Sequence, residues 1–85
     1  MVVITEVIWT KKFEHELRKL RDKTVKDRAK KRIQKILDKP ETGKPLRFGL
    51  KGERSVYVPP YRLIYAVQGA TLYLLRFEHR KVVYR

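Results

Sequence analysis

The chain has 85 residues, and its 22 Lys and Arg against 9 Asp and Glu give a formal net charge of +13 at pH 7. Such an excess predicts a polyanionic partner, either nucleic acid or an acidic protein. The chain has no cysteine, which excludes disulfides, thiolate metal sites and a cysteine nucleophile, and its 2 histidines make a weak case for a metal, so we expect no cofactor.

Membrane insertion is not expected. No apolar run approaches the roughly 20 residues needed to span a bilayer, and the N-terminus lacks the basic start and cleavage site of a signal peptide. We therefore expect a cytoplasmic protein. A chain of this length should form one domain, residues 1–85, that buries roughly 60 to 65% of the surface of the unfolded chain.

The start of the chain predicts a strand followed by a short helix. Residues 2–9 are rich in β-branched side chains and carry apolar groups on both faces, which favours a strand that is largely covered. Thr10 is a plausible helix N-cap. Phe13, Leu17 and Leu20 then follow at spacings of four and three, the stripe of an amphipathic helix.

A second helix is expected after a break at residues 22–23. Thr24 is the predicted N-cap, Asp27 suits the positive start of the helix, and Pro40 ends it. Its apolar stripe comprises Val25, Ala29, Ile33, Ile36 and Leu37. The segment from Lys11 to Lys39 also holds 13 basic residues, almost all off the two stripes. We expect a solvated outer face, with non-specific phosphate contacts as the alternative.

The second half of the chain predicts an antiparallel meander. Residues 40–53 are rich in Gly and Pro and read as a connector around a short extended piece at 46–48. Strands are then expected at residues 54–58, 61–67 and 71–77, separated by a bend at Pro59 and Pro60 and a turn at Gln68 and Gly69. A final extended segment spans residues 81–85.

The length of the second turn bears on which side chains share a sheet face. If the turn after Val67 has two residues, Arg62 and Arg76 lie on opposite faces, whereas a three-residue turn places them on one face. Sequence leaves the register open. We expect Arg76 to be an edge or surface ion-pair residue rather than part of a site.

Two segments in the last third of the chain suggest chemistry on a phosphate. Residues 60–65 (Pro-Tyr-Arg-Leu-Ile-Tyr) and 78–84 (Glu-His-Arg-Lys-Val-Val-Tyr) each set arginine beside tyrosine or histidine. A guanidinium on a strand is costly to desolvate unless it meets an anion, and its planar fork suits phosphate oxygens. The neighbouring imidazole and phenol can exchange protons.

The order of these elements, with Tyr61–Arg62 at a strand start and His79–Arg80 to Tyr84 at the end, resembles the RelE/ParE toxin superfamily over essentially the whole chain. Gly49 and Gly52 in the connector add to the likeness. The resemblance implies an α+β fold of order β-α-α-β-β-β. Two antiparallel helices would pack on one face of a twisted, mainly antiparallel sheet, and the site would lie on the open, basic face.

The resemblance also implies a toxin of a type II toxin–antitoxin pair. The RelE branch cuts messenger RNA in the ribosomal A site without a metal: the ribose 2′-hydroxyl attacks the scissile phosphate, leaving a 2′,3′-cyclic phosphate and a free 5′-hydroxyl. The ParE branch inhibits DNA gyrase. A non-catalytic nucleic-acid-binding module is a third possibility. The implied partner is an acidic, partly disordered, RelB-like antitoxin that covers the basic surface.

The family's roles fall on four residues of this sequence. Arg62 would stabilise charge on the phosphorane, and Arg80 would help the leaving group or the phosphate. Tyr84 is the candidate base, and His79 competes with it because its ordinary pKa is nearer to neutrality. The alternatives are purely structural roles, in which Arg62 forms an ion pair with Glu53 or Glu78 and the side chains of Tyr84 and His79 serve only in packing.

The sequence departs from the best-studied ribosome-dependent members, because Ser55 and Tyr57 stand where they have two strand lysines. This departure favours the ParE-like or weakly active alternatives. Nearby cations and aromatic rings could supply phosphate contacts and stack on bases. The RNA-binding residues that we predict are Arg47, Lys51, Arg54, Tyr57, Tyr61, Lys81 and Arg85.

Overall fold

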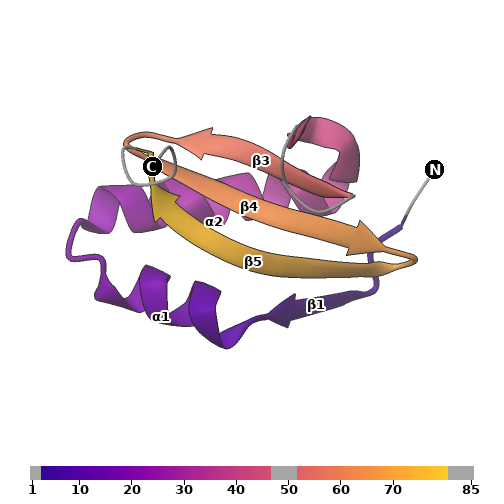
Figure 1. Ribbon diagram of the computed structural model, residues 1–85, viewed down its shortest axis with the longest axis horizontal. Helices are drawn as coiled ribbons and strands as arrows, with labels where there is room; N and C mark the ends of the chain where they lie inside the picture. Colours follow the sequence, from indigo (N-terminus) through magenta and orange to yellow (C-terminus); the bar gives the residue numbers. More distant parts are fainter. Residues whose placement is uncertain (1–2, 47–51, 81–85) are drawn as a thin grey trace.

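The computed structural model describes residues 3–46 and 52–80. It is a five-stranded sheet with two helices against it (Figure 1), so the predicted packing of two helices on a sheet is confirmed, with one short strand more than the predicted order. The elements in chain order are β1 (Glu6–Trp9), α1 (Lys11–Lys19), α2 (Lys23–Asp38), the 3₁₀ turn η1 (Pro40–Thr42), β2 (Lys44–Pro45), β3 (Glu53–Val58), β4 (Tyr61–Gln68) and β5 (Thr71–His79). The spatial order is β1-β5-β4-β3-β2, with β1 parallel to β5 and the other pairs antiparallel.

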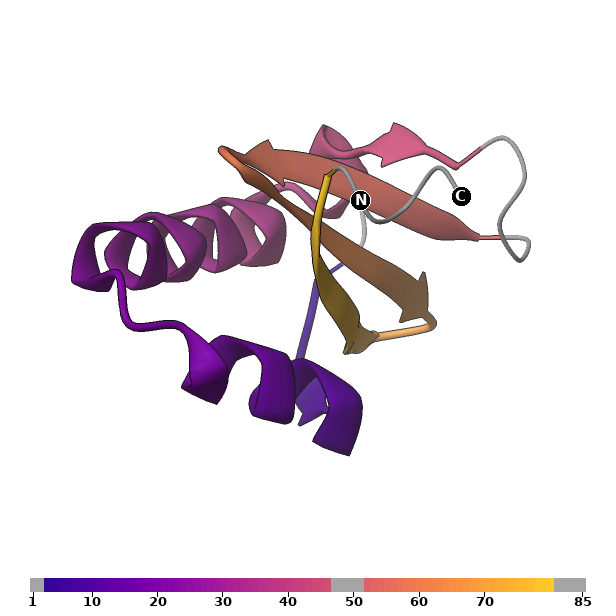
Figure 2. The ribbon, with the colours of Figure 1, turned by 60° about the vertical axis from the view of Figure 1, so that its left-hand side comes forward.

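Both helices lie on the same side of the sheet, as Figure 2 shows. The core between the two layers is built from the predicted helical stripes and from alternate strand residues, and Phe13, Ile36, Tyr65, Leu72 and Leu74 lie fully buried in it. The ring of Phe13 meets that of Phe77 edge to face at 6.0 Å between centroids. None of the helices in residues 3–46 and 52–80 lies on the far side of the sheet, and we call that side the open face.

The helix starts agree with expectation at one position and not at the other. Thr10 caps α1, and its hydroxyl accepts a hydrogen bond from the Phe13 N–H at 3.2 Å. The cap of α2 is Asp22, so the prediction of Thr24 was wrong. The Asp22 carboxylate accepts from the N–H groups of Thr24 and Val25. A carboxylate is an equally good cap and also complements the positive helix end, which moves the start towards the N-terminus.

The connector differs from the prediction in its extended part. The two-residue strand is β2, Lys44–Pro45, which pairs with Arg54 and Ser55 of β3, whereas the predicted piece at 46–48 continues into residues outside the described range. The predicted end of the second helix at Pro40 is confirmed, since α2 ends at Asp38 with Lys39 as its C-cap, and Pro40 begins η1.

A β-bulge decides the face on which Arg76 lies. The turn has two residues, Gly69 and Ala70, between the paired Gln68 and Thr71. Arg62 pairs with Glu78 and Ile64 with Arg76, but the register shifts by one between Ile64 and Tyr65. With a two-residue turn and regular pairing, Arg62 and Arg76 would lie on opposite faces. The bulge adds one unpaired residue to β5 and shifts the alternation of faces by one, so Arg62 and Arg76 share the open face. The predicted link between turn length and face was wrong for this reason.

The described residues include no helix long and apolar enough to cross a membrane. Within the same ranges, no group of three His, Asp or Glu side chains is placed to hold a metal ion. The segment predicted to be extended at 81–85 lies outside the described residues.

Candidate functional site

The open face brings together Tyr57 of β3, Arg62 of β4 and Glu78 of β5. These three residues are successive cross-strand partners, and side chains at directly opposed positions point to the same face of an antiparallel sheet. Arg80 follows the end of β5. Strand pairing therefore places the arginine of the first predicted segment beside the end of the second.

A groove of about 330 Å³ lies where this face meets the outer edge of β3, next to β2. Its lining consists of Arg32, Thr42, Lys44, Ser55, Val56, Tyr57, Arg62 and Arg80. Four of these residues are cationic and none of the described ones is acidic, so the groove is suited to an anion. We call it the arginine groove.

Arg80 is held at this groove by two contacts. Its backbone N–H donates to the carbonyl oxygen of Pro60 at 3.0 Å, which ties the end of β5 to the β3–β4 turn. Its guanidinium lies over the ring of Tyr57, with 5.2 Å between the guanidinium carbon and the ring centroid. A cation–π contact of this kind favours one orientation of the guanidinium. Tyr57 remains 46% exposed, so its ring is accessible.

Arg76 is an ion-pair residue, as predicted. Its guanidinium contacts the Glu53 carboxylate at 3.0 Å and the Glu78 carboxylate at 2.7 Å, bridging β3 and β5 across β4. Glu53 is only 5% exposed, so this pairing compensates a carboxylate that is nearly removed from water. Both acids that the sequence suggested as partners for Arg62 are therefore bonded to Arg76.

His79 and Tyr61 lie on the other face of the sheet, towards α1. The Tyr61 ring stacks on Phe77 at 5.0 Å between centroids, and His79 meets Tyr61 edge to face at 5.3 Å. Both line a separate groove of about 530 Å³ against α1. The residues predicted as one site are thus divided by the sheet, with Arg62, Arg80 and Tyr57 on one side and His79 and Tyr61 on the other.

Arg54 supports the connector. Its guanidinium donates to the carbonyl oxygen of Gly43 at 2.7 Å and to that of Glu41 at 3.4 Å. The five other predicted site residues, Arg47, Lys51, Lys81, Tyr84 and Arg85, lie outside the described residues, and their roles stay predictions.

Sequence reasoning missed two of the four cations in the groove, Arg32 and Lys44. Lys44 follows a glycine and precedes a proline, a pattern that indicates only a connector. Arg32 is one of 13 cations in the helical segment, and nothing in the helical repeat separates it from the others. Only the packing of α2 and β2 against β3 identifies them.

The buried phenol of Tyr65 holds the connector that carries Lys44. Its hydroxyl donates to the carbonyl oxygen of Pro40 at 2.7 Å and accepts from the Gly43 N–H at 2.9 Å. Burial raises the pKa of this phenol above its ordinary 10.0, although the hydrogen bond from Gly43 and the charge of Arg54 act in the opposite direction. The fold therefore favours the protonated phenol.

We expect Tyr65→Phe to lower the free energy of unfolding by about 1–3 kcal/mol near neutral pH, because the Pro40 carbonyl and the Gly43 N–H each lose a buried partner. Above pH 10 the unfolded phenol ionises before the folded one does, so the parent loses stability and the difference should narrow. Urea unfolding at several pH values measures both effects. Tyr73→Phe is the control, and an equal loss from both substitutions would contradict the role of Tyr65.

Comparison with known proteins identifies the family of this chain. Residues 7–84 match the family model described as the ParE toxin of the type II toxin–antitoxin system parDE. A search among curated proteins found no match.

Three solved structures illustrate the likeness. The RelBE2 toxin–antitoxin complex from Mycobacterium tuberculosis matches at 30% identity and a TM-score of 0.74, covering 92% of this chain and 100% of that one. The YoeB/ParE toxin from Agrobacterium tumefaciens gives 18% identity, coverage of 89% and 99%, and a TM-score of 0.79. The DinJ–YafQ complex from Escherichia coli gives 17%, 98% and 100%, and 0.77.

The two weaker identities establish the fold alone, whereas the family match spans nearly the whole sequence. The chain belongs to the ParE toxin family of type II toxin–antitoxin systems, within the RelE/ParE superfamily.

Proposed function

We propose that this toxin is a ribosome-dependent mRNA endoribonuclease that inhibits translation. The observation that carries the proposal is the arginine groove, which is lined by Arg62, Arg80 and the exposed ring of Tyr57. Two guanidinium groups suit a phosphate that gains negative charge during reaction, and an accessible phenol ring suits an unpaired base.

The proposed reaction needs no metal. The ribose 2′-oxygen attacks the adjacent phosphorus while a base takes its proton, and the bond from phosphorus to the 5′-oxygen breaks as that oxygen gains a proton. The products are a 2′,3′-cyclic phosphate and a 5′-hydroxyl. Arg62 and Arg80 would stabilise the crowded dianionic phosphorane, because preorganised donors act most strongly where charge develops. Lys44 would hold a neighbouring phosphate.

Proton transfer is assigned to Tyr84, which matches the family's terminal tyrosine and lies outside the described residues. His79 is the less favoured base, because it lies on the helix side of the sheet against Tyr61, away from the arginine groove. A direct role in proton transfer requires hydrogen-bond reach of the reacting hydroxyl, alone or through one water.

A ParE-type gyrase inhibitor is the second candidate. The matching family model bears the ParE description, and Ser55 and Tyr57 stand in the groove where ribosome-dependent members have lysines. In this alternative the same arginines would contact protein or DNA without cleavage. A module that only binds nucleic acid is the remaining outcome.

The proposed partner in the resting state is an acidic, RelB-like antitoxin. Several of the matching structures are toxin–antitoxin complexes, and a chain of charge +13 would attract an acidic partner rapidly and in a salt-sensitive way. Action on ribosomes would place the toxin in the cytoplasm.

The decisive experiment is toeprinting of mRNA on programmed ribosomes, run beside a gyrase supercoiling assay with the same preparation. We expect new 5′ ends within the A-site codon and no loss of supercoiling by gyrase. A chelator should not change the cleavage, apart from its effect on the ribosome itself. Inhibited supercoiling with intact mRNA would establish the gyrase reading. Binding without either activity would leave the non-catalytic module.

A further inference from the structure

A second basic groove adjoins the arginine groove. It has a volume of about 360 Å³ and is lined by Arg28, Lys31, Arg32, Lys35, Tyr57, Val58 and Pro59. Arg32 and Tyr57 line both grooves, so the two hollows meet at the outer edge of β3, near Tyr57. We call the second hollow the helix groove.

The cations of the helix groove form one side of α2. Arg28, Lys31, Arg32 and Lys35 stand at positions i, i+3, i+4 and i+7, which project in one direction at 3.6 residues per turn. They are all exposed, whereas Ala29, Ile33 and Ile36 are buried against the sheet. From Arg28 to Lys35 the side runs along about 10 Å of helix.

The two grooves together present seven cations and no described acidic residue. The cations are Arg28, Lys31, Arg32, Lys35, Lys44, Arg62 and Arg80. By contrast, the groove beside His79 is lined by the acidic residues Glu16, Asp22 and Glu78 as well as by basic side chains. Its positive and negative charges therefore partly compensate each other. A surface of one sign that continues from a phosphate site is suited to further phosphates of the same strand.

The surface is apolar where the arginine groove and the helix groove meet. Tyr57 is exposed beside the edge residues Val58 and Pro59. An accessible aromatic ring between two sets of cations is the arrangement that single-strand binders use, with bases stacked on rings and the backbone on cations. Arg80 covers the Tyr57 ring at 5.2 Å, so a base would stack on the ring in concert with, or in exchange for, that guanidinium.

We propose that the helix groove is a second binding subsite for the same single-stranded RNA, which passes from Arg62 and Arg80 over Tyr57 onto the basic side of α2. This inference rests on the proposed function for its substrate class. It adds that the strand extends beyond the scissile phosphate in one direction, and that Arg32 and Tyr57 mark the junction.

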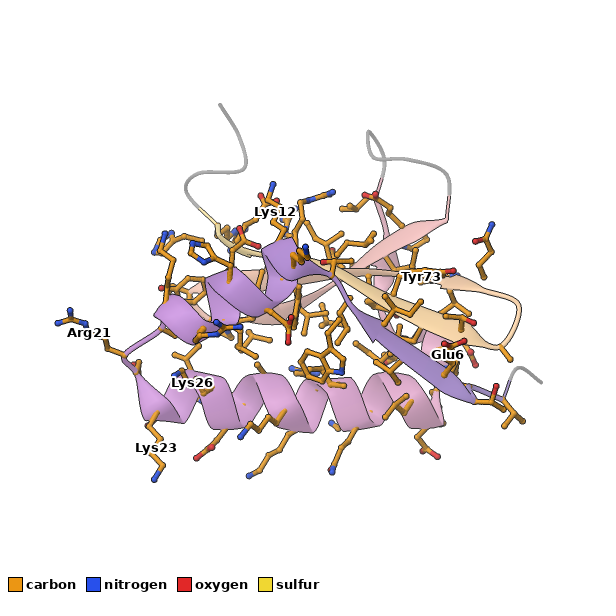
Figure 3. All side chains as sticks on the ribbon, turned by 90° about the horizontal axis from the view of Figure 1, so that it is seen from below. Glu6, Lys12, Arg21, Lys23, Lys26 and Tyr73 are labelled. Carbon is orange, nitrogen blue, oxygen red and sulfur yellow. The ribbon has the colours of Figure 1, made fainter. Side chains whose placement is uncertain are left out.

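The chain supplies a matched control on the same helix. Lys23, Lys26 and Lys30 lie on the other side of the buried stripe and line neither groove; Figure 3 shows Lys23 and Lys26 on α2. The variant Arg28→Gln/Lys31→Gln/Lys35→Gln removes three charges from the helix groove. Lys23→Gln/Lys26→Gln/Lys30→Gln removes three charges from the control side. Glutamine has a helix propensity close to that of lysine and arginine, so both variants should keep α2.

The experiment measures fluorescence anisotropy with 2′-O-methyl oligouridines of about 4 and about 12 nucleotides, within the range of single-strand site sizes. The 2′-methyl group removes the attacking hydroxyl, so binding is read without cleavage. The parent should gain affinity with length. The helix-groove variant should bind the long strand roughly tenfold to a hundredfold more weakly near 0.1 M salt, with a salt slope lower by about 2, and bind the short strand almost as well.

The control variant should keep most of the length-dependent gain. Equal losses in both triple variants, or an equal loss on both oligonucleotides, would overturn the second subsite, since a general charge effect predicts them. If the helix-groove variant kept its RNA affinity but bound the antitoxin more weakly, the second subsite would also be overturned, and the helix groove would be assigned to antitoxin binding. Because binding is read without ribosomes or turnover, failure of this inference is distinguishable from failure of the nuclease assignment, which toeprinting tests.

Discussion

Replacing Arg62 or Arg80 with alanine is expected to slow single-turnover cleavage of ribosome-bound mRNA by about 10²-fold or more. This is the scale for losing a preorganised donor to charge that develops in the transition state. Affinity for the uncleaved complex should fall much less, because the two guanidinium groups act mainly after the 2′-oxygen attacks. Quenched single-turnover assays at saturating toxin separate the two effects.

Arg21→Ala is the matched control for charge. Arg21 is exposed in the link between the helices, and Figure 3 shows its side chain extending away from the sheet. Its loss should leave the cleavage rate within a few-fold of the parent. Should Arg62→Ala and Arg80→Ala cleave as fast as Arg21→Ala, the arginine groove is not the reaction centre.

The same assay separates the two candidate bases. His79→Gln should cleave nearly like the parent, because His79 lies across the sheet from Arg62 and Arg80. Tyr84→Phe should lose roughly 10² to 10⁴-fold if the phenol transfers a proton. The reverse ordering would transfer that role to His79.

Gly43→Ala is expected to be the most destabilising small substitution in the connector. A Cβ at this position would lie 2.7 Å from the Tyr65 Oη, 2.8 Å from its Cε1 and 2.9 Å from the carbonyl oxygen of Ser55. Two of these neighbours belong to a fully buried ring and one is strand backbone, so none can yield easily. Overpacking of this kind costs about 1–3 kcal/mol or more.

The backbone of Gly43 does not itself require glycine, since its φ of −78° is open to any residue. Without the clash, Gly→Ala would stabilise the protein by about 0.4–1 kcal/mol through the unfolded chain. The fall in melting temperature, roughly 4–8 °C per kcal/mol, would therefore measure the cost of the clash less this gain. The substitution should also weaken RNA binding, because Lys44 lies next to the displaced residue in the arginine groove.

Thr42→Ala, at an exposed neighbouring position, controls for general sensitivity of the connector. The double variant Gly43→Ala/Tyr65→Phe should recover part of the loss, because it removes the nearest of the three contacts. A melting temperature for Gly43→Ala at or above that of the parent would show that the connector relaxes without cost.

Most of the elements followed from local patterns. The stripe Val25, Ala29, Ile33 and Ile36 predicted α2, and each of these residues is buried. Thr10 capped α1 as expected. Such features depend on residues three or four apart, so side-chain chemistry and helical geometry are enough to predict them. The mistaken cap at Thr24 shows the usual limit, since two adequate capping residues stood two positions apart.

The faces of the sheet were not predictable in the same way. A single bulged residue in β5 changed the parity between Arg62 and Arg76, and it left His79 on the helix side with Tyr61, its partner on β4. Sequence proximity suggested that His79 and Arg80 act together, yet His79 ends β5 on the helix side and Arg80, the next residue, lines the arginine groove. Pairing register is set by the packed side chains of both strands and by the bulge, none of which a single segment contains.

The sequence by itself determined that this is a small basic chain with helical stripes, strand patterns and arginines whose guanidinium groups suit phosphate, and its motifs resemble those of the RelE/ParE superfamily. The first of these properties depend on composition and short-range periodicity, and the resemblance depends on the order of the motifs. Only the tertiary structure decided which cations form the site. Arg32 and Lys44 join Arg62 and Arg80 because β2 pairs with the outer edge of β3 and α2 packs beside it. Contacts between residues so distant in the chain arise from the packing of whole layers, which no local pattern encodes.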